Sequence, residues 1–282
     1  MHSSGEVYFP SCPRLKLKLM LRADFFFRLV TSDFHFADLR RAFRSPDPLR
    51  ASSRRVSRVV VQAQAGSERE PWDFGRFAQT LLTFNAPPSP AKVLAKVFGS
   101  EKVTTLDKGE TLWSVNETND IDWGSLDDVV MGGVSVSSFE ISSQGGIFSG
   151  NISESNNGGF AGVRTKVFDS PFDLSKCAGI KIKFKGDGQR MKLVLRDDSD
   201  WNGIAWTATF DTDANRQRET RIPFSTLKAT KYAKILDTTS GFNSSNVCAV
   251  QLVLSKFEFE KDLNPKFKPG RFEFTLIDIS TY

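Results

Sequence analysis

The fold class of this chain is decided by residues 179–196, which read GIKIKFKGDGQRMKLVLR. Apolar side chains occupy every second position on both sides of the central Gly-Asp-Gly, at Ile180, Ile182, Phe184, Met191, Leu193 and Leu195. This alternation is typical of β-strands that bury one face. The second strand then carries Lys192, Val194 and Arg196 on its opposite face. Glycine adopts the positive φ that tight turns require, so residues 186–188 predict a hairpin between the two strands.

Short β-rich runs of the same kind fill the chain from Thr111 to Tyr282, separated by Gly, Asn and Asp turns. Strands are expected at 112–117, 134–140, 146–152, 160–167, 179–185, 190–197, 204–210, 217–223, 247–254 and 271–279. No helical period separates them, so two sheets are expected to bury their alternating side chains against each other. Residues 111–282 are therefore predicted to form an all-β sandwich or jelly roll.

A helical segment is expected at 67–110, before this domain. Apolar residues recur at helical spacing at Phe74, Phe77, Ala78, Leu81 and Leu82. They predict an amphipathic helix that ends near Asn85. Three prolines follow, so a second short helix is expected to begin only around Pro90. Both helices are expected to dock on the sandwich, and the alternative is that they recruit a partner.

Residues 1–66 differ from the rest of the chain in charge. They contain twelve Lys and Arg against five Asp and Glu, a net charge of +7, whereas 67–282 carries −2. An Arg- and Ser-rich leader that ends in small residues predicts an organelle transit peptide, with a disordered basic tail as the alternative. The near-neutral remainder argues against direct nucleic-acid binding. No apolar run reaches about 18 residues, so a transmembrane span is not expected.

Histidine is missing from the predicted mature chain, because His2 and His35 both lie in the leader. Histidine is the usual base for Ser and Cys nucleophiles and a common zinc ligand, so its absence disfavours catalytic triads and zinc sites. The three cysteines follow neither a disulfide framework nor a metal-binding spacing. The chain is therefore expected to have no catalytic residues, no metal site and no cofactor.

Paired carboxylates leave an enzymatic alternative open. They occur at Asp127-Asp128, at Asp197-Asp198 with Asp200, and at Asp211 with Asp213. A carboxylate-based hydrolase uses two such groups, but adjacent turn aspartates are more often solvated caps or hairpin residues. Oxygen-rich loops also suit a structural Ca²⁺, although no loop here matches a Ca²⁺ motif.

The segment Trp123–Ser135, WGSLDDVVMGGVS, resembles the signature of the complex I intermediate-associated protein 30 family, in which an acidic turn leads to Met-Gly-Gly-x-Ser. Further family-like segments follow in order at 148–150, 157–164, 186–188, 222–224 and 270–282. The resemblance covers 111–282 and implies a galactose-binding-like jelly roll. It also implies a non-enzymatic, chaperone-like factor that assists the assembly of mitochondrial complex I.

The partners that this resemblance implies are protein subunits of an organellar electron-transfer complex. Without a transmembrane span, the protein itself is expected to lie peripherally at the inner or thylakoid membrane. Residues 72–77, with Phe84-Asn85 and Pro87-Pro88, are similar to what precedes the domain in members from photosynthetic organisms. This similarity indicates a plant-type member and favours the chloroplast stroma over the mitochondrial matrix. The alternative role is then a plastid factor in the biogenesis of a photosystem or of the NADH dehydrogenase-like complex.

Candidate partner-binding residues gather around the signature and the turns that follow it. They are Asp127, Asp128, Met131, Gly132, Gly133, Ser135, Gly159, Phe160, Arg164 and Trp201. The glycines would let a partner approach the backbone, or else serve a bulge and turn that the fold requires. Trp201 is expected at a loop tip, and aromatic platforms of this kind also grip sugars, which makes a carbohydrate-binding module a second alternative. Trp206 is expected in the core.

Overall fold

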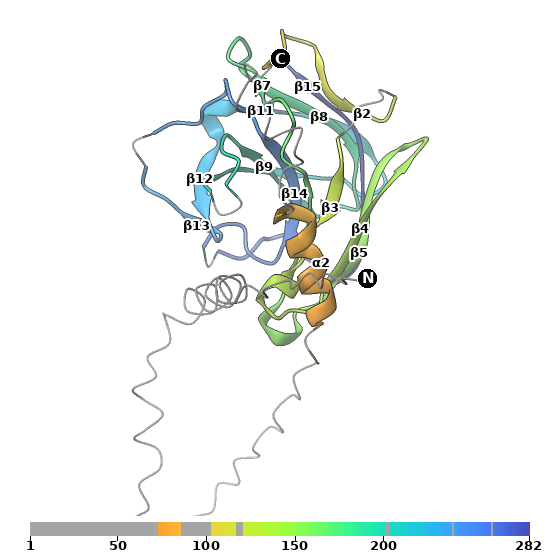
Figure 1. Cartoon of the computed structure of the whole chain (residues 1–282). Helices are drawn as coiled ribbons and strands as arrows, with labels where there is room; N and C mark the ends of the chain where they lie inside the picture. Colours follow the sequence, from red (N-terminus) through yellow and green to blue (C-terminus); the bar gives the residue numbers. More distant parts are fainter. Residues whose placement is uncertain are drawn as a thin grey trace, which may run out of the picture. The chain divides into compact units, whose positions relative to one another are not determined.

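Two β-sheets pack face to face (Figure 1). Their alternating apolar side chains form the buried core between them. The computed structural model describes residues 71, 73–85, 103–116, 121–200, 203–238, 240–260 and 262–282. The predicted leader and the second helix expected around Pro90 lie outside these residues. The architecture confirms the predicted all-β sandwich with a short N-terminal helical segment.

One sheet has seven strands within the described residues, in the order β13-β12-β10-β9-β14-β6-β3. Its strands are β3 (Trp123–Ser125), β6 (Phe160–Thr165), β9 (Arg190–Arg196), β10 (Ala205–Asp211), β12 (Lys228–Lys231), β13 (Lys234–Ile235) and β14 (Ala249–Ser255). Neighbouring strands of this sheet run antiparallel. Its central strands β9 and β14 supply much of the apolar core.

The opposing sheet has the order β11-β8-β15-β5-β4, with β2 paired to the end of β15. Its strands are β2 (Thr111–Ser114), β4 (Val136–Ser142), β5 (Gly145–Ile152), β8 (Gly179–Lys185), β11 (Gln217–Pro223) and β15 (Gly270–Thr281). A separate parallel pair joins β1 (Thr104–Thr105) to β7 (Phe172–Asp173). The short 3₁₀ helices are η1 (Asp128–Met131), η2 (Ser155–Asn157) and η3 (Phe224–Thr226).

The hairpin predicted at 186–188 is wrong, because β8 and β9 belong to different sheets. The connection between them crosses from one sheet to the other and is held by the β10–β11 loop. Gly188 N donates to Thr212 Oγ1 at 3.0 Å, and Asn215 N donates to the Gly186 carbonyl at 2.9 Å. Both strands still turn their apolar side chains into the same core, from opposite sheets. The alternation therefore predicted the buried faces correctly, but the predicted pairing of β8 with β9 was wrong.

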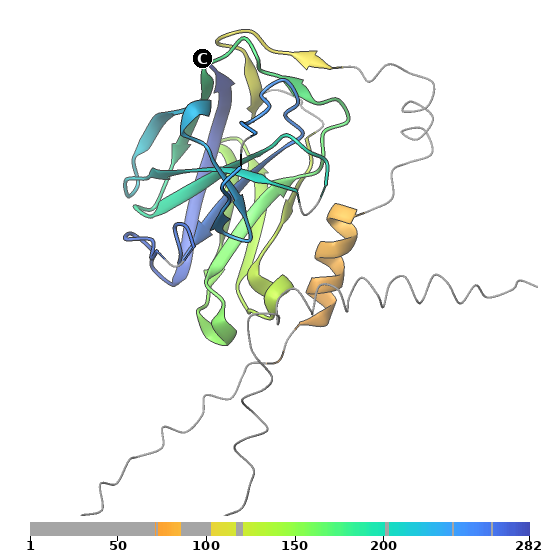
Figure 2. The same cartoon turned by 90° about the vertical axis from the view of Figure 1, so that its left-hand side faces the viewer.

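Helix α2 (Phe74–Asn85) packs beside the sandwich against β3 and η1 (Figure 2). Its limits confirm the predicted first helix, and its contacts confirm that this helix docks. The Asp73 carboxylate caps the helix by accepting a hydrogen bond from Arg76 N at 2.9 Å. A Cβ at Gly124 of β3 would lie 3.0 Å from side-chain atoms of both Thr83 and Phe84, so the glycine lets the helix approach the strand.

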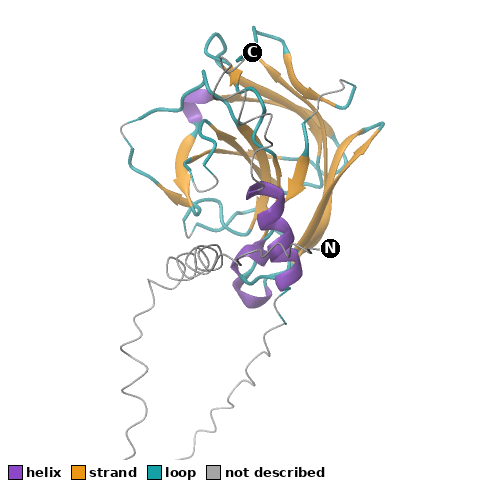
Figure 3. Ribbon diagram, viewed as in Figure 1, coloured by secondary structure: helices purple, strands orange, loops and turns teal. Residues whose placement is uncertain are grey.

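The helical turn η1 lies beside α2 at one end of the strands (Figure 3). Asn156 of η2 donates a hydrogen bond of 3.1 Å to the Gly132 carbonyl that follows η1. This end of the sandwich is where the Trp123–Ser135 segment passes from β3 of one sheet toward β4 of the other. The fold therefore brings the signature segment, the β5–β6 loop and α2 together.

Candidate functional site

The signature segment is built around a short helical turn with a glycine stop. Asp127 precedes η1 in an extended conformation, and Gly132 ends it with a left-handed φ of 88°. The Gly132 N–H donates to the carbonyl of Val129 at 3.2 Å. A side chain at φ +88° would be strained, so glycine is favoured at this position.

Asp128 is completely buried and joins two loops through one carboxylate. Its Oδ1 accepts from Ser135 N at 2.9 Å, while its Oδ2 accepts from Ser135 Oγ at 2.6 Å and from Gly159 N at 2.8 Å. Added Cβ atoms at Gly133 and Gly158 would lie 2.3 Å and 2.5 Å from atoms of this carboxylate. These two glycines therefore leave the space that the Asp128 side chain occupies.

Asp127 ties the same segment to β4, to β6 and to helix α2. Its carboxylate accepts hydrogen bonds from Ser137 Oγ at 2.5 Å, Ser137 N at 2.9 Å and Gly162 N at 3.4 Å. Arg76 Nη2 of α2 pairs with Oδ2 at 2.8 Å, and Arg76 Nη1 donates to the Ser135 carbonyl at 3.0 Å. Burial raises the pKa of the Asp127 carboxyl, and the hydrogen bonds from Ser137 and the charge of Arg76 oppose this rise.

Most predicted site residues of the signature therefore face inward. Asp127, Asp128, Gly133, Ser135 and Gly159 are buried, which contradicts the expectation that the two aspartates are solvated caps. Their contacts fit the alternative that the fold itself requires this turn. Their role in partner binding stays a prediction.

Met131 is the part of the signature that reaches solvent. Its side chain is 53% exposed, and Val136 at the start of β4 is 50% exposed. Gly132 and Phe160 are half-buried. Trp201 lies outside the described residues, whereas Trp206 is buried in the core as predicted.

Arg164 of β6, a candidate partner-binding residue, is buried. Its side chain points away from the core cluster and lies beneath α2, with its Cζ 5.9 Å from the centre of the Phe84 ring. Desolvation, followed by the nearby charge of Arg196, lowers the pKa of Arg164 to about 9. Lys192 and Arg196 share this face of the seven-stranded sheet, an association that the sequence analysis missed although the alternation on β9 had placed both on one side.

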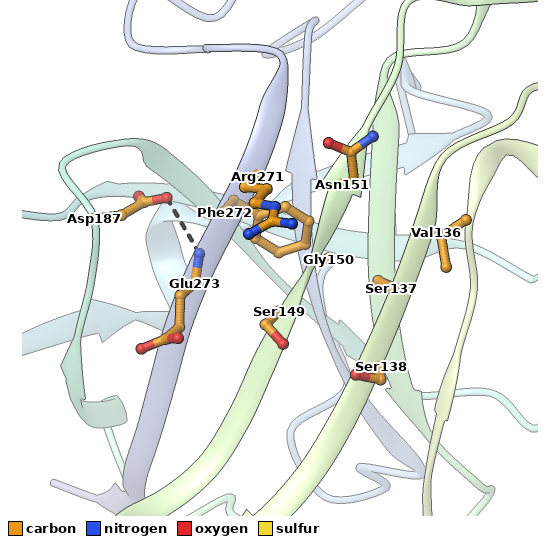
Figure 4. Close-up of a pocket in the computed structure, with 10 residues that line it drawn as sticks. All are labelled: Val136, Ser137, Ser138, Ser149, Gly150, Asn151, Asp187, Arg271, Phe272 and Glu273. Carbon is orange, nitrogen blue, oxygen red and sulfur yellow. Dashed lines mark hydrogen bonds between the residues drawn. The ribbon is translucent and has the colours of Figure 1, made fainter.

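An open groove of about 620 Å³ lies on the outer face of the other sheet (Figure 4). It is lined by Val136, Ser137, Ser138, Ser149, Gly150, Asn151, Asp187, Arg271, Phe272 and Glu273. Figure 4 shows Arg271 and Glu273 on β15 beside Ser149 and Asn151 on β5, with a hydrogen bond of 3.4 Å from Glu273 N to Asp187 Oδ2. The groove is mainly apolar in surface, and its lining includes charged residues of both signs, Asp187, Arg271 and Glu273. No sequence pattern pointed to it.

The other carboxylate pairs are engaged in local structural contacts. Asp211 pairs with Arg190 at 2.7 Å and with Lys266 at 3.0 Å, and the hydrogen bond from Arg190 lowers the pKa of Asp211. Asp213 pairs with Arg218. Asp197 accepts from Asn243 N at 2.9 Å. Among the described residues, no group of three or more His, Cys, Asp or Glu side chains is placed to hold a metal ion.

None of the helices in the described part of the chain has the length and apolar character needed to cross a membrane.

Solved structures of carbohydrate-binding modules resemble this chain distantly. The Family 11 module of the cellulosomal cellulase Lic26A-Cel5E of Clostridium thermocellum is 15% identical, with a TM-score of 0.46, over 63% of this chain and 96% of that chain. A module specific for non-crystalline cellulose, CBM28, is 13% identical, with a TM-score of 0.30, over 64% of this chain and 98% of that chain. At these values, the sugars bound by those modules say nothing about the ligands of this chain.

No curated protein matches the sequence. A family model for Complex I intermediate-associated protein 30 (CIA30) matches residues 113–276. The match includes the whole signature segment and runs from β2 into β15, so it spans most strands of both sheets. Because it covers more than half of the sequence, the chain belongs to the Complex I intermediate-associated protein 30 family.

Proposed function

We propose that this protein is a non-enzymatic, chaperone-like assembly factor that holds intermediates of a membrane electron-transfer complex, and that this complex is complex I. The family match over residues 113–276 carries the proposal, because the family is described by its association with complex I intermediates. Its partners are then protein subunits that await incorporation into the complex.

The contacts of the signature support a binding role over a catalytic one. Catalytic carboxylates must reach a substrate, whereas Asp127 and Asp128 are buried and accept hydrogen bonds from within the chain. This network fixes the backbone of a surface turn on which Met131 is displayed. A rigid turn with an exposed methionine suits contact with apolar protein surface, since its flexible side chain adapts to irregular partners.

The proposed contact surface comprises Met131, Val136 and the adjoining groove on β4, β5 and β15. Val136 connects Met131 to the groove, because it is half exposed at the start of β4 and also lines the groove. Protein interfaces commonly combine an apolar centre with a polar rim. The serines of β4 and β5 and the charged residues of β15 would provide that rim.

We place the protein in an organelle to which it is imported. The family is described by its association with complex I, which favours the mitochondrial matrix. The chloroplast stroma is the alternative, because residues 72–88 are similar to the segment before this domain in members from photosynthetic organisms. The plastid role differs only in the identity of the assembled complex, so the same experiment tests both.

The test is to delete the protein and resolve the membrane complexes of isolated mitochondria and plastids on native gels. Loss of mature complex I with accumulation of partial assemblies is expected. Loss of a photosystem or of the plastid NADH dehydrogenase-like complex would move the role to the chloroplast. Unchanged levels of all three complexes would refute an assembly function.

A further inference from the structure

Helix α2 docks on the sandwich through polar residues. Arg76 Nη2 pairs with the Asp127 carboxylate at 2.8 Å, and Thr80 is buried. Thr83 lies against β3, because a Cβ added at Gly124 would be 3.0 Å from its methyl group. Arg76, Thr80 and Thr83 are four and three residues apart, so they share one face of the helix. We call these three residues the docking face.

The opposite side of α2 is apolar and exposed. Phe74 and Ala78 lie two positions before and after Arg76, and Leu82 continues their line one turn later. Residues two positions apart on a helix point about 200° apart, so this line faces away from the docking face. Leu82 is 72% exposed, and Phe74 is 64% exposed although its ring lies 6.1 Å from that of Phe77. We call Phe74, Ala78 and Leu82 the outer stripe.

This orientation reverses that of most surface helices. A surface helix of a globular domain normally buries its apolar stripe and exposes its polar residues, as the sequence also predicted for α2. Single exposed apolar side chains are common on proteins and need no explanation. The outer stripe differs because its members are aligned over two turns of a helix whose polar side is the docked one (Figure 2). An aligned apolar surface of this kind suits contact with another molecule.

The charge of α2 indicates which kind of molecule fits the outer stripe. The helix sequence FGRFAQTLLTFN contains no acidic residue and a single basic one, Arg76. That arginine is directed at the sandwich, where it also donates to the Ser135 carbonyl at 3.0 Å. Helices that lie on anionic membranes carry Lys and Arg along their polar face, which α2 does not. An uncharged stripe is instead complementary to the side of an uncharged apolar helix.

We propose that the outer stripe is a docking surface for an apolar helix of an unassembled membrane subunit. The inference rests on the proposed assembly function, which supplies this class of partner. A membrane span consists of about 20 mostly apolar residues, and before it is assembled these need cover from water. Helix α2 also packs against η1, the turn that displays Met131 (Figure 3). A subunit that contacts Met131 is therefore within reach of α2.

The docking face sets the direction in which the outer stripe points. Arg76 contacts both Asp127 and the Ser135 carbonyl, at 2.8 Å and 3.0 Å. Rolling the helix so that the outer stripe met the sandwich would break both contacts and leave the Asp127 carboxylate without its cation. Arg76 is therefore a positioning residue for the stripe, although it does not belong to it.

The experiment measures binding of a defined apolar helix to the purified full chain. The probe is a fluorescent synthetic peptide of about 20 alternating Leu and Ala residues with a Lys pair at each end, followed by anisotropy in dilute detergent. The wild type should bind it saturably. Leu82→Glu should weaken binding by about tenfold or more, because it sets a charge against the apolar peptide, whereas Leu82→Met should bind like the wild type.

Gln79→Glu is the matched control, since it adds the same charge to an exposed position of α2 outside the outer stripe. It should bind the peptide like the wild type. Leu82→Glu should also keep the wild-type Tm, because the side chain is already exposed. The proposal is wrong if the peptide does not bind saturably, or if Leu82→Glu and Gln79→Glu have equal effects.

Further outcomes would identify a different occupant and also overturn the proposal. A clear loss of Tm in Leu82→Glu would mean that the chain covers its own stripe. A wild-type dimer that Leu82→Glu dissociates, seen by analytical ultracentrifugation, would identify a second copy. Sedimentation of the wild type, but not of Leu82→Glu, with phosphatidylcholine and phosphatidylglycerol vesicles would identify a bilayer.

The peptide assay is independent of the deletion experiment that tests the proposed function. Loss of peptide binding in Leu82→Glu, with all membrane complexes intact after deletion of the protein, would refute the assembly role and keep the outer stripe. Loss of mature complex I on deletion, with normal peptide binding by Leu82→Glu, would refute the outer stripe alone.

Discussion

Arg76 of helix α2 donates a hydrogen bond of 2.8 Å to the buried carboxylate of Asp127, 51 residues further along the chain. The arginine side chain is 29% exposed, and the aspartate side chain is 1% exposed. This contact joins the pre-domain helix to the signature of the family. The position of α2 and the geometry of the signature turn are therefore linked.

Arg76→Leu is expected to lower the free energy of unfolding by about 1–3 kcal/mol. The substitution removes a charged partner from a buried carboxylate, but the hydrogen bonds from Ser137 and Gly162 remain and limit the loss. Urea unfolding measures it. The control is Lys166→Gln, whose pair with Asp122 is solvent-exposed on both sides and should contribute less than about 1 kcal/mol. Equal effects of the two substitutions would show that Arg76 does not anchor the helix.

Asp127 should make the protein less stable as the pH rises through the acid range. Its folded pKa is raised above the unfolded value, so the folded state holds this proton more tightly. The favourable contribution is present below the unfolded pKa of 3.8 and is lost as the pH rises through the folded pKa. Relative to Asp127→Asn, the wild type should therefore lose stability as the pH rises above 3.8 and through the higher folded pKa.

Asp211 should change the stability of the protein with pH in the opposite direction from Asp127. The pKa of Asp211 is lowered by the hydrogen bond from Arg190, so its contribution is present above the unfolded pKa and is lost as the pH falls through the folded one. Urea titrations of Asp127→Asn and Asp211→Asn across the acid range should give difference curves of opposite slope. Parallel curves would contradict the assigned environments.

Gly133→Ala is expected to destabilise the fold by about 1–3 kcal/mol or more, because the new Cβ would lie 2.3 Å from Asp128 Cγ. A loss of about 1 kcal/mol corresponds to a fall of about 2–4 °C in Tm for a domain of this size. Gly241→Ala is the control, since no atom lies within 4 Å of its added Cβ. A Gly133→Ala melt that matches both the wild type and the control would mean that the Asp128 carboxylate has an alternative position.

The sandwich could be predicted from the sequence, because the alternation of apolar and polar residues along each strand indicates which side chains are buried. It could not report sheet membership: Ile182 and Leu193 follow the same pattern, yet β8 and β9 lie in opposite sheets. The short strands β12 and β13 were missed because two to four residues are too few to establish a period.

The candidate site was less predictable, because burial of a polar residue depends on distant parts of the chain. Asp128 resembles any turn aspartate until Gly159, 31 residues later, donates to its carboxylate. Arg164 resembles a surface anchor until Phe84 of α2 covers it. The glycines of the signature were recognised, but the carboxylate that requires their missing side chains could be identified only in three dimensions.

Met131→Glu tests the proposed contact surface directly. Because the side chain is 53% exposed, the substitution should change the free energy of unfolding by no more than about 0.5 kcal/mol. A charge at the centre of an apolar contact opposes binding, so tagged Met131→Glu should recover fewer subunits of the assembled complex than the wild type, as measured by mass spectrometry of material purified from the organelle. Ile235→Glu is the matched control, since this residue is 42% exposed on β13 of the other sheet. Equal recovery by both variants and the wild type would exclude Met131 from the interface, whereas an equal loss in both would indicate a general effect of the added charge.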